Sequence, residues 1–190
     1  MAVVRILSLD PKRTMRLFVA IELPDDVKDA LTALRTEGSA RRTKRDQLHL
    51  TLRFIGDGIA QPQFVAIKQA LADVKAAPFA MQFRGVGQFP NGRKSARVLW
   101  AGIAPNPALD ALQAQIETAL GNTGLEPEDR PFSAHITLAR LDPPQNASPF
   151  LETYQSFESR AIPVDEFILF SSILSPQGAT HHIEASYKLR

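Results

Sequence analysis

Residues 47–56 constrain the fold more than any other part of the sequence, because apolar and polar residues alternate along them. The apolar side chains recur at every second position: Leu48, Leu50, Leu52 and Phe54. A period of two is typical of a β-strand with one buried face, so we expect these four side chains to pack inward. The polar residues His49, Thr51 and Arg53 then share the other face, about 6–7 Å apart. An imidazole, a hydroxyl and a guanidinium in one row suit a phosphate group better than a hydrophobic core.

A second stretch, residues 132–140, repeats this pattern. His135 and Thr137 again lie two positions apart on one strand face, with Ile136 and Leu138 on the other. One such row would be unremarkable on a surface strand. The chain has only four histidines, however, and two of them occur in the same setting, His-apolar-Thr-Leu. The repetition therefore favours two halves of one functional site.

The order of the expected elements predicts an α+β fold with mainly antiparallel pairing. Strands alternate with helices, and the second half of the chain broadly repeats the first. We expect two pseudo-symmetric lobes with helices packed outside the sheets and a central cleft that both His-x-Thr strands face. The expected strands are residues 16–23, 47–56, 79–89, 97–102, 132–140, 162–174 and 183–189, and the expected helices are residues 24–34, 62–76, 106–120 and 148–157.

Length and composition indicate one bilobal domain at residues 15–190 of the 190-residue chain. Residues 1–14 precede a second methionine, Met15, and we expect them to form a disordered extension. The absence of cysteine excludes disulfides and thiolate chemistry and fits a cytoplasmic location. No apolar run approaches the roughly 20 residues that span a bilayer. Net charge is only +2, but basic residues gather at positions 41–45, where they can help to hold a polyanion. We expect a monomer.

Four blocks of the sequence resemble those of the bacterial and archaeal RNA 2′,3′-cyclic phosphodiesterases, also called 2′-5′ RNA ligases, of the two-histidine (2H) phosphoesterase superfamily. They are Arg-Leu-Phe-Val-Ala-Ile-Glu-Leu-Pro at 16–24, Leu-His-Leu-Thr-Leu-Arg-Phe-Ile-Gly at 48–56, Arg-Val-Leu-Trp-Ala-Gly at 97–102, and Arg-Pro-Phe-Ser-Ala-His-Ile-Thr-Leu-Ala-Arg at 130–140. Two positions depart from the family pattern. Ala134 replaces the usual proline before the second histidine, and His181-His182 stands where an Arg-Tyr pair is common.

The resemblance implies metal-independent hydrolysis of RNA 2′,3′-cyclic phosphate ends to 2′-phosphates, with no cofactor. It assigns His49 as general acid to the O3′ leaving group and His135 as general base to water, although the near symmetry of the motifs leaves this order open. The hydroxyls of Thr51 and Thr137 would stabilise charge on the phosphate. Arg130 matches the arginine of the family's last block and would contact phosphate.

Two further residues are candidate substrate contacts. Arg53 shares the His49 face of the predicted strand, where we expect it at the rim of the site. Phe18, in the first strand, can stack on a base, although an aromatic residue there is also typical of a core. The expected partners are RNA ends with a cyclic phosphate, such as tRNA halves, or small nucleotides.

Other functions remain open at this point. A 2H phosphoesterase can act on another cyclic or 2′-5′-linked nucleotide, and a non-catalytic protein can bind RNA ends in the same cleft. Ligation would be the reverse reaction, because the sequence contains no Gly-x-x-x-x-Gly-Lys-Ser/Thr nucleotide-binding run.

Overall fold

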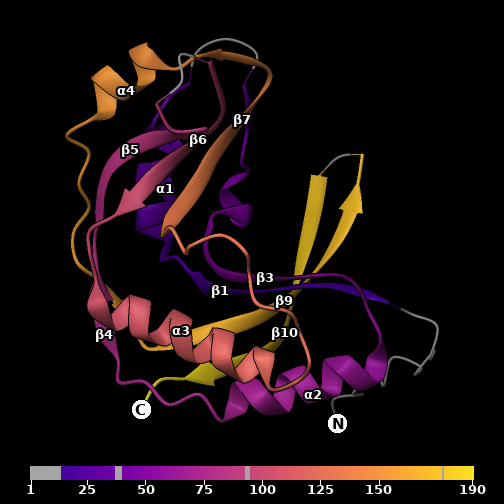
Figure 1. The fold of residues 1–190 in the computed structure, drawn as a ribbon. Helices are drawn as coiled ribbons and strands as arrows, with labels where there is room; N and C mark the ends of the chain where they lie inside the picture. The colour runs from indigo at the N-terminus through magenta and orange to yellow at the C-terminus, as the bar shows by residue number, and fades with distance from the viewer. Residues whose placement is uncertain (1–13, 37–39, 93–94, 177) are drawn as a thin grey trace, which may run out of the picture.

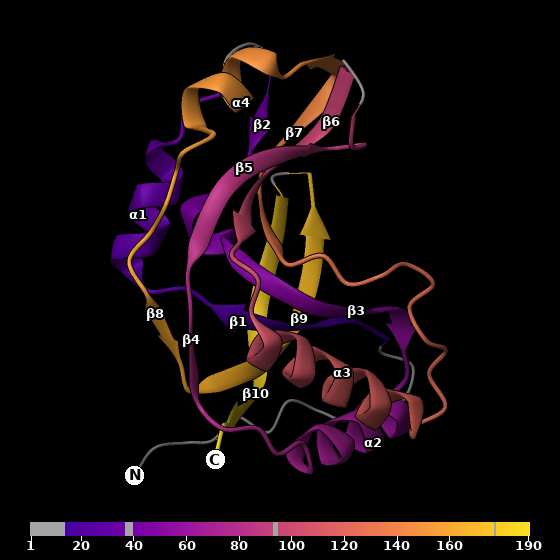
Figure 2. The same cartoon turned by 60° about the vertical axis from the view of Figure 1, so that its left-hand side comes forward.

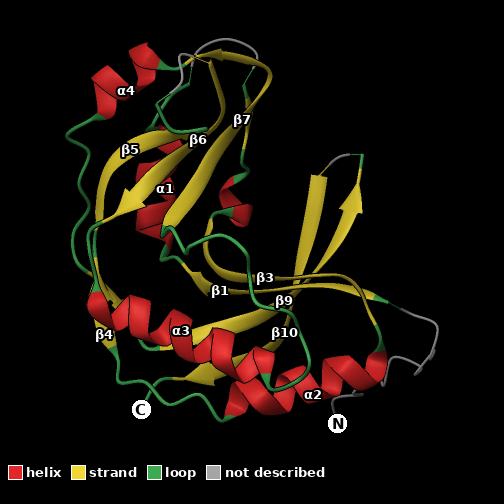
Figure 3. Ribbon diagram, in the orientation of Figure 1, coloured by secondary structure: helices red, strands yellow, loops and turns green. Residues whose placement is uncertain are grey.

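Two four-stranded antiparallel sheets form the framework of the protein, seen in a computed structural model (Figures 1 and 3). The first sheet contains, in spatial order, β10 (Gly178–Lys188), β9 (Glu166–Ser175), β1 (Met15–Glu22) and β3 (His49–Ile59). The second contains β2 (Arg41–Arg42), β7 (His135–Asn146), β6 (Ser95–Ile103) and β5 (Phe83–Phe89). A two-stranded sheet pairs β4 (Phe79–Met81) with β8 (Ile162–Val164).

The structure describes residues 14–36, 40–92, 95–176 and 178–190. The extension predicted for residues 1–14 therefore lies outside the described residues, apart from Thr14. None of the helices within the described ranges is long and apolar enough to cross a membrane.

The helices are α1 (Asp25–Ala33), the 3-10 helix η1 (Arg45–Gln47), α2 (Gln61–Ala72), α3 (Pro107–Gly121) and α4 (Ser148–Tyr154). Helices α2 and α3 pack against each other, with α3 also against β3 and α2 against β10. Figure 2 shows this helix pair on the first sheet and α1 beside the second. Local chemistry starts the helices where the sequence predicts: acidic residues occupy the first turn of α1, and the Asn106 side chain caps α3 by accepting from Leu109 N at 3.2 Å.

One continuous hydrophobic core joins the two sheets. It contains the inward residues of β1 and β3 together with those of β6 and β7, for example Leu17, Leu50, Leu99 and Ile136. The predicted α+β class is confirmed, while the central cleft between lobes stays a prediction. The predicted strand 79–89 is divided: β4 pairs with β8, whereas β5 pairs with β6.

A short segment carries the chain from one sheet to the other. Arg41 and Arg42 pair with Arg140 and Ala139 of β7, and the Thr43 amide then donates to the Leu138 carbonyl at 2.8 Å. The segment thus runs toward the start of β7 before η1 leads it into β3. Strands β3 and β7, which carry the two His-x-Thr motifs, lie in contact.

Candidate active site

His49 begins β3 and lies on an aromatic support. Its ring stacks on Phe18, with ring centroids 4.8 Å apart, and the ring of His181 meets it edge-on at 5.2 Å. Phe18 in turn stacks on Phe170 at 5.1 Å. These residues occupy the face of the first sheet opposite the main core, where Phe18 and Phe170 form a small separate cluster. The cluster holds the imidazole against a rigid surface and removes much of it from water.

This environment makes His49 a neutral imidazole in the free protein. Burial of the ring, and then the positive charge of the neighbouring His181, lower the pKa of His49 to about 4. A hydrogen bond to the Gln47 carbonyl opposes the shift. The pKa of His181 is also lowered, mainly by burial.

His135 begins β7 and is held in an equivalent way. Its Nδ1 lies 2.7 Å from the Ser133 carbonyl, and its ring contacts Phe89 edge-on at 5.0 Å and Trp100 at 6.2 Å. Burial lowers the pKa of His135, as does the charge of Arg140, while the hydrogen bond to Ser133 opposes the shift. Each histidine therefore binds the carbonyl two residues before it. A carbonyl can only accept, so Nδ1 of His135 carries the proton and Nε2 is left for the reaction.

The threonines occupy the same strand faces as their histidines. Thr51 lies two residues after His49, and Thr137 two residues after His135. On the second sheet Thr137 pairs with Trp100, whose indole lies flat over Gly87: a Cβ added there would be 2.1 Å from the indole. Gly87 thus leaves the room that lets Trp100 lie beside His135.

A β-bulge follows the threonine in each motif. Ala20 pairs with Thr51, but the next pair is Val19 with Arg53, so Leu52 has no partner in β1. Likewise Trp100 of β6 pairs with Thr137 and Leu99 pairs with Ala139, so Leu138 has no partner in β6. A bulge inserts one residue and exchanges the two faces of the strand beyond it.

The bulge overturns two expectations for the first strand. Arg53 does not share the face of His49 and does not lie at a rim: it pairs with the fully buried Val19 and is itself 8% exposed. Phe54, expected inside, is 37% exposed, and the Arg16 guanidinium lies 4.4 Å from its ring.

Arg53 instead joins β3 to the chain that leads to His135. Its Nη1 donates to Glu128 at 3.0 Å and its Nη2 to the Glu126 carbonyl at 2.5 Å. Its Nε lies 3.2 Å from Glu117 of α3, whose other oxygen accepts from the Glu128 amide at 2.9 Å. Nη1 and Nη2 of Arg53 donate to protein groups and its Nε faces Glu117, so this buried guanidinium is not a substrate contact.

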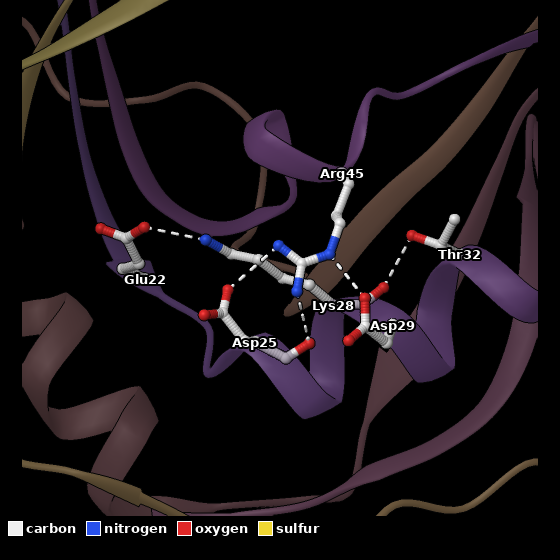
Figure 4. Close-up of polar contacts among 6 residues, drawn as sticks. All are labelled: Glu22, Asp25, Lys28, Asp29, Thr32 and Arg45. Atoms are coloured by element: carbon white, nitrogen blue, oxygen red, sulfur yellow. Dashed lines mark hydrogen bonds and ion pairs between the residues drawn. The ribbon is translucent and has the colours of Figure 1, made fainter.

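A polar network fixes the entry to β3 (Figure 4). Arg45 of η1 donates to the carboxylates of Asp29, at 2.5 Å, and Asp25, at 3.0 Å, both on α1. Lys28, only 6% exposed, donates to Glu22 at 2.8 Å, and Glu22 pairs with His49 across β1 and β3. Helix α1 thereby sets the position of the residues on either side of His49.

The remaining predicted contacts lie in different places. Phe18 is 5% exposed, and its ring supports His49, which leaves little of its surface for a base. Arg130 has a side chain that is 87% exposed, 3.6 Å from Glu128. His181, one of the two departures from the family pattern, lies against His49 and Phe18, whereas His182 is exposed. Within the described part of the chain, no three His, Cys, Asp or Glu side chains are grouped to hold a metal ion.

Sequence comparison decides the family. Residues 23–173 match the sequence model of the 2′-5′ RNA ligase superfamily. The chain belongs to this superfamily. The predicted family is thereby confirmed.

Several RNA 2′,3′-cyclic phosphodiesterases are similar in sequence to this chain over most of its length. An RNA 2′,3′-cyclic phosphodiesterase of Archaeoglobus fulgidus is 31% identical over 86% of this chain and 94% of its own, and one of Thermus thermophilus is 34% identical over 93% and 91%. Among solved structures, Escherichia coli LigT complexed with 3′-AMP has a TM-score of 0.74 at 23% identity, covering 93% of this chain and 99% of LigT. The last similarity shows that the fold is shared.

Arg140 is a candidate site residue that the sequence pattern did not single out. Simple alternation from His135 places it on the inner face, but the bulge at Leu138 returns it to the face of His135 and Thr137. Its side chain is exposed, and its charge is close enough to lower the pKa of His135. The sequence feature that marks the position of the bulge is the Thr-Leu pair repeated in both motifs, because Leu52 and Leu138 are the unpaired residues.

Proposed function

We propose that this protein hydrolyses 2′,3′-cyclic phosphates at RNA ends without a metal ion and leaves the phosphate on O2′. The observation that carries the proposal is the pair of equivalently held imidazoles: His49 begins β3, His135 begins β7, and each binds the carbonyl two residues before it. The names of the Archaeoglobus and Thermus superfamily members support the same activity.

The reaction needs one proton removed and one supplied. In the proposed mechanism Nε2 of His135 takes a proton from water as the water oxygen attacks phosphorus. The bond from phosphorus to O3′ breaks, and the His49 imidazolium gives its proton to O3′. Thr51 and Thr137 donate hydrogen bonds to the non-bridging oxygens. Arg140 adds a positive charge on the His135 side, and Arg130 is the second candidate cation.

Substrate binding supplies the protonation state that His49 needs. In the free protein the pKa of His49 is about 4, so the ring is neutral near pH 7. An anionic cyclic phosphate placed against it favours the imidazolium form and raises this pKa. His49 therefore gains its proton together with the substrate.

The same ring opening accounts for ligation when a hydroxyl replaces water. We propose that 2′-5′ ligation, where it occurs, is attack of an O5′ hydroxyl on the cyclic phosphate with the histidines in the same roles as for water. The physiological RNA, monomeric state and cytoplasmic location stay predictions.

The experiment that tests the proposal is product analysis by chromatography. A 2′,3′-cyclic nucleotide incubated with the protein in EDTA should yield the 2′-phosphate. His49→Ala and His135→Ala should each lower the rate about 10²–10⁴-fold, the range for one positioned proton-transfer group. A 3′-phosphate product would show that the bond from phosphorus to O2′ breaks, not the bond to O3′. Activity lost in EDTA and restored by zinc or manganese would replace this mechanism with a metal-dependent one, and variants that keep the wild-type rate would remove the histidines from catalysis.

A further inference from the structure

The three arginines at positions 41–45 separate into two groups. Arg42 donates to the carbonyls of Thr32 and Leu34, the latter at 3.2 Å, and Arg45 binds the carboxylates of α1. These two side chains are engaged in holding α1. Arg41, in contrast, is exposed and takes part in no ion pair with the described residues.

Strand pairing places Arg41 on the face of the active site. Arg42 pairs with the buried Ala139 and points to α1, so Arg41, one residue earlier, points to the opposite face. Its partner across the strands is Arg140, which shares that face with His135 and Thr137. Arg41 and Arg140 therefore stand side by side at the edge of the second sheet, where β2 is the outermost strand.

Two arginines in direct cross-strand opposition repel each other. No acidic partner within the described residues relieves this pair, because Arg140 also lacks an ion pair there. The arrangement suits an anion with more than one charged group lying along the sheet edge, and consecutive phosphates of a nucleic-acid strand have this form.

We infer that Arg41 binds the backbone phosphate that precedes the cyclic phosphate, so that the enzyme acts on RNA strands more efficiently than on cyclic mononucleotides. The inference rests on the proposed function and names its substrate class. Arg140, on β7, faces the reacting phosphate. Arg41 lies one strand further out, about 4.8 Å away in the sheet, and faces the next phosphate on the 5′ side.

The test compares kcat/KM for a short oligoribonucleotide ending in a 2′,3′-cyclic phosphate with kcat/KM for a cyclic mononucleotide. Arg41→Gln should lower the oligonucleotide value about tenfold, mainly through KM, since it removes one charge-assisted contact. The mononucleotide has no preceding phosphate, so its value should change little. The slope of log(1/KM) against log salt for the oligonucleotide should also become shallower by about 0.7, as expected for one lost phosphate contact.

Arg35→Gln is the matched control, because Arg35 is exposed just after α1 and directly follows Leu34, whose carbonyl accepts from Arg42 rather than from Arg41. It removes the same charge and should leave both substrates unaffected. Equal losses on both substrates, no loss, or the same loss with Arg35→Gln would overturn the inference. Failure of the proposed function is distinguishable, since the wild-type protein would then turn over neither substrate. Fluorescence titration with an oligonucleotide carrying a 2′-phosphate end decides the Arg41 contact independently of turnover: weaker binding only in Arg41→Gln supports it, and equal binding rejects it.

Discussion

At the scale of single residues, the two histidines share a hydrogen-bonding arrangement but differ in burial. His49 is enclosed by Phe18 and His181, whereas His135 has Phe89 and Trp100 beside it. The pKa of His49 falls to about 4 as a result, and that of His135 is also lowered. In the proposed mechanism the two proton carriers are therefore unequal.

The buried His49 should make the protein less stable in acid. Its pKa in the fold, about 4, lies below the unfolded value of 6.5, so between these values the unfolded chain binds more protons. The stabilisation is complete above pH 6.5 and is lost as the pH falls toward 4, by up to about 3 kcal/mol. Urea unfolding at several pH values should show this loss. His49→Gln should make the dependence shallower, and the part due to the lowered pKa values of His135 and His181 should remain. His182→Gln, a change to an exposed histidine, should keep the wild-type slope; an unchanged slope in His49→Gln would contradict the argument.

At the scale of elements, alternation predicted the strands well up to the bulges. Leu48, Leu50 and Leu52 are buried as expected, and each histidine shares a face with its threonine. Beyond Leu52 the faces exchange, which misplaced Arg53 and Phe54. A bulge depends on how two strands pair across the sheet, and the sequence of one strand does not reveal that pairing.

The division of residues 79–89 has a similar origin. Their alternating pattern fits one strand, but β4 and β5 pair with β8 and β6, segments far apart in the sequence. Only the tertiary arrangement determines where the first pairing ends and the second begins. The common face of histidine and threonine in each motif could be predicted, because each motif occupies the first three residues of its strand, before the bulge.

Arg53 should matter for stability because it is a buried cation between two carboxylates. Arg53→Met would remove the buried partner of Glu117 and Glu128, which are themselves partly exposed, and should cost about 1–3 kcal/mol, the range for a buried polar group that loses its partner. Guanidinium unfolding measures the loss. Arg16→Gln breaks the exposed pair with Asp57 in the same strand pair and should cost less than about 1 kcal/mol. Similar costs for the two variants would show that the Arg53 cluster does not hold β3 to the chain before His135.

At the scale of the whole molecule, the two sheets are joined so that neither motif is placed independently. The segment from β2 to η1 pairs with β7 and then enters β3, and Arg45 ties it to α1. Arg53 connects β3 to the chain before β7. The repeated halves are thus held together from both directions, and the difference between them lies in the surroundings of each histidine.

This difference can be tested by asking which histidine acts as the general acid and which as the general base. Two groups acting together, one protonated and one neutral, give a bell-shaped dependence of rate on pH whose limbs belong to the pair. A substrate with a better leaving group at O3′ needs little help from an acid, so it should restore much of the activity of His49→Ala and little of that of His135→Ala. Thr51→Ala and Thr137→Ala are the matched controls: they should slow the reaction while preserving the shape of the pH profile, because hydroxyls do not titrate in this range. Restoration of His135→Ala instead would exchange the two roles, and would mean that the low pKa of His49 makes it the base. Restoration of neither variant would remove the acid from the mechanism.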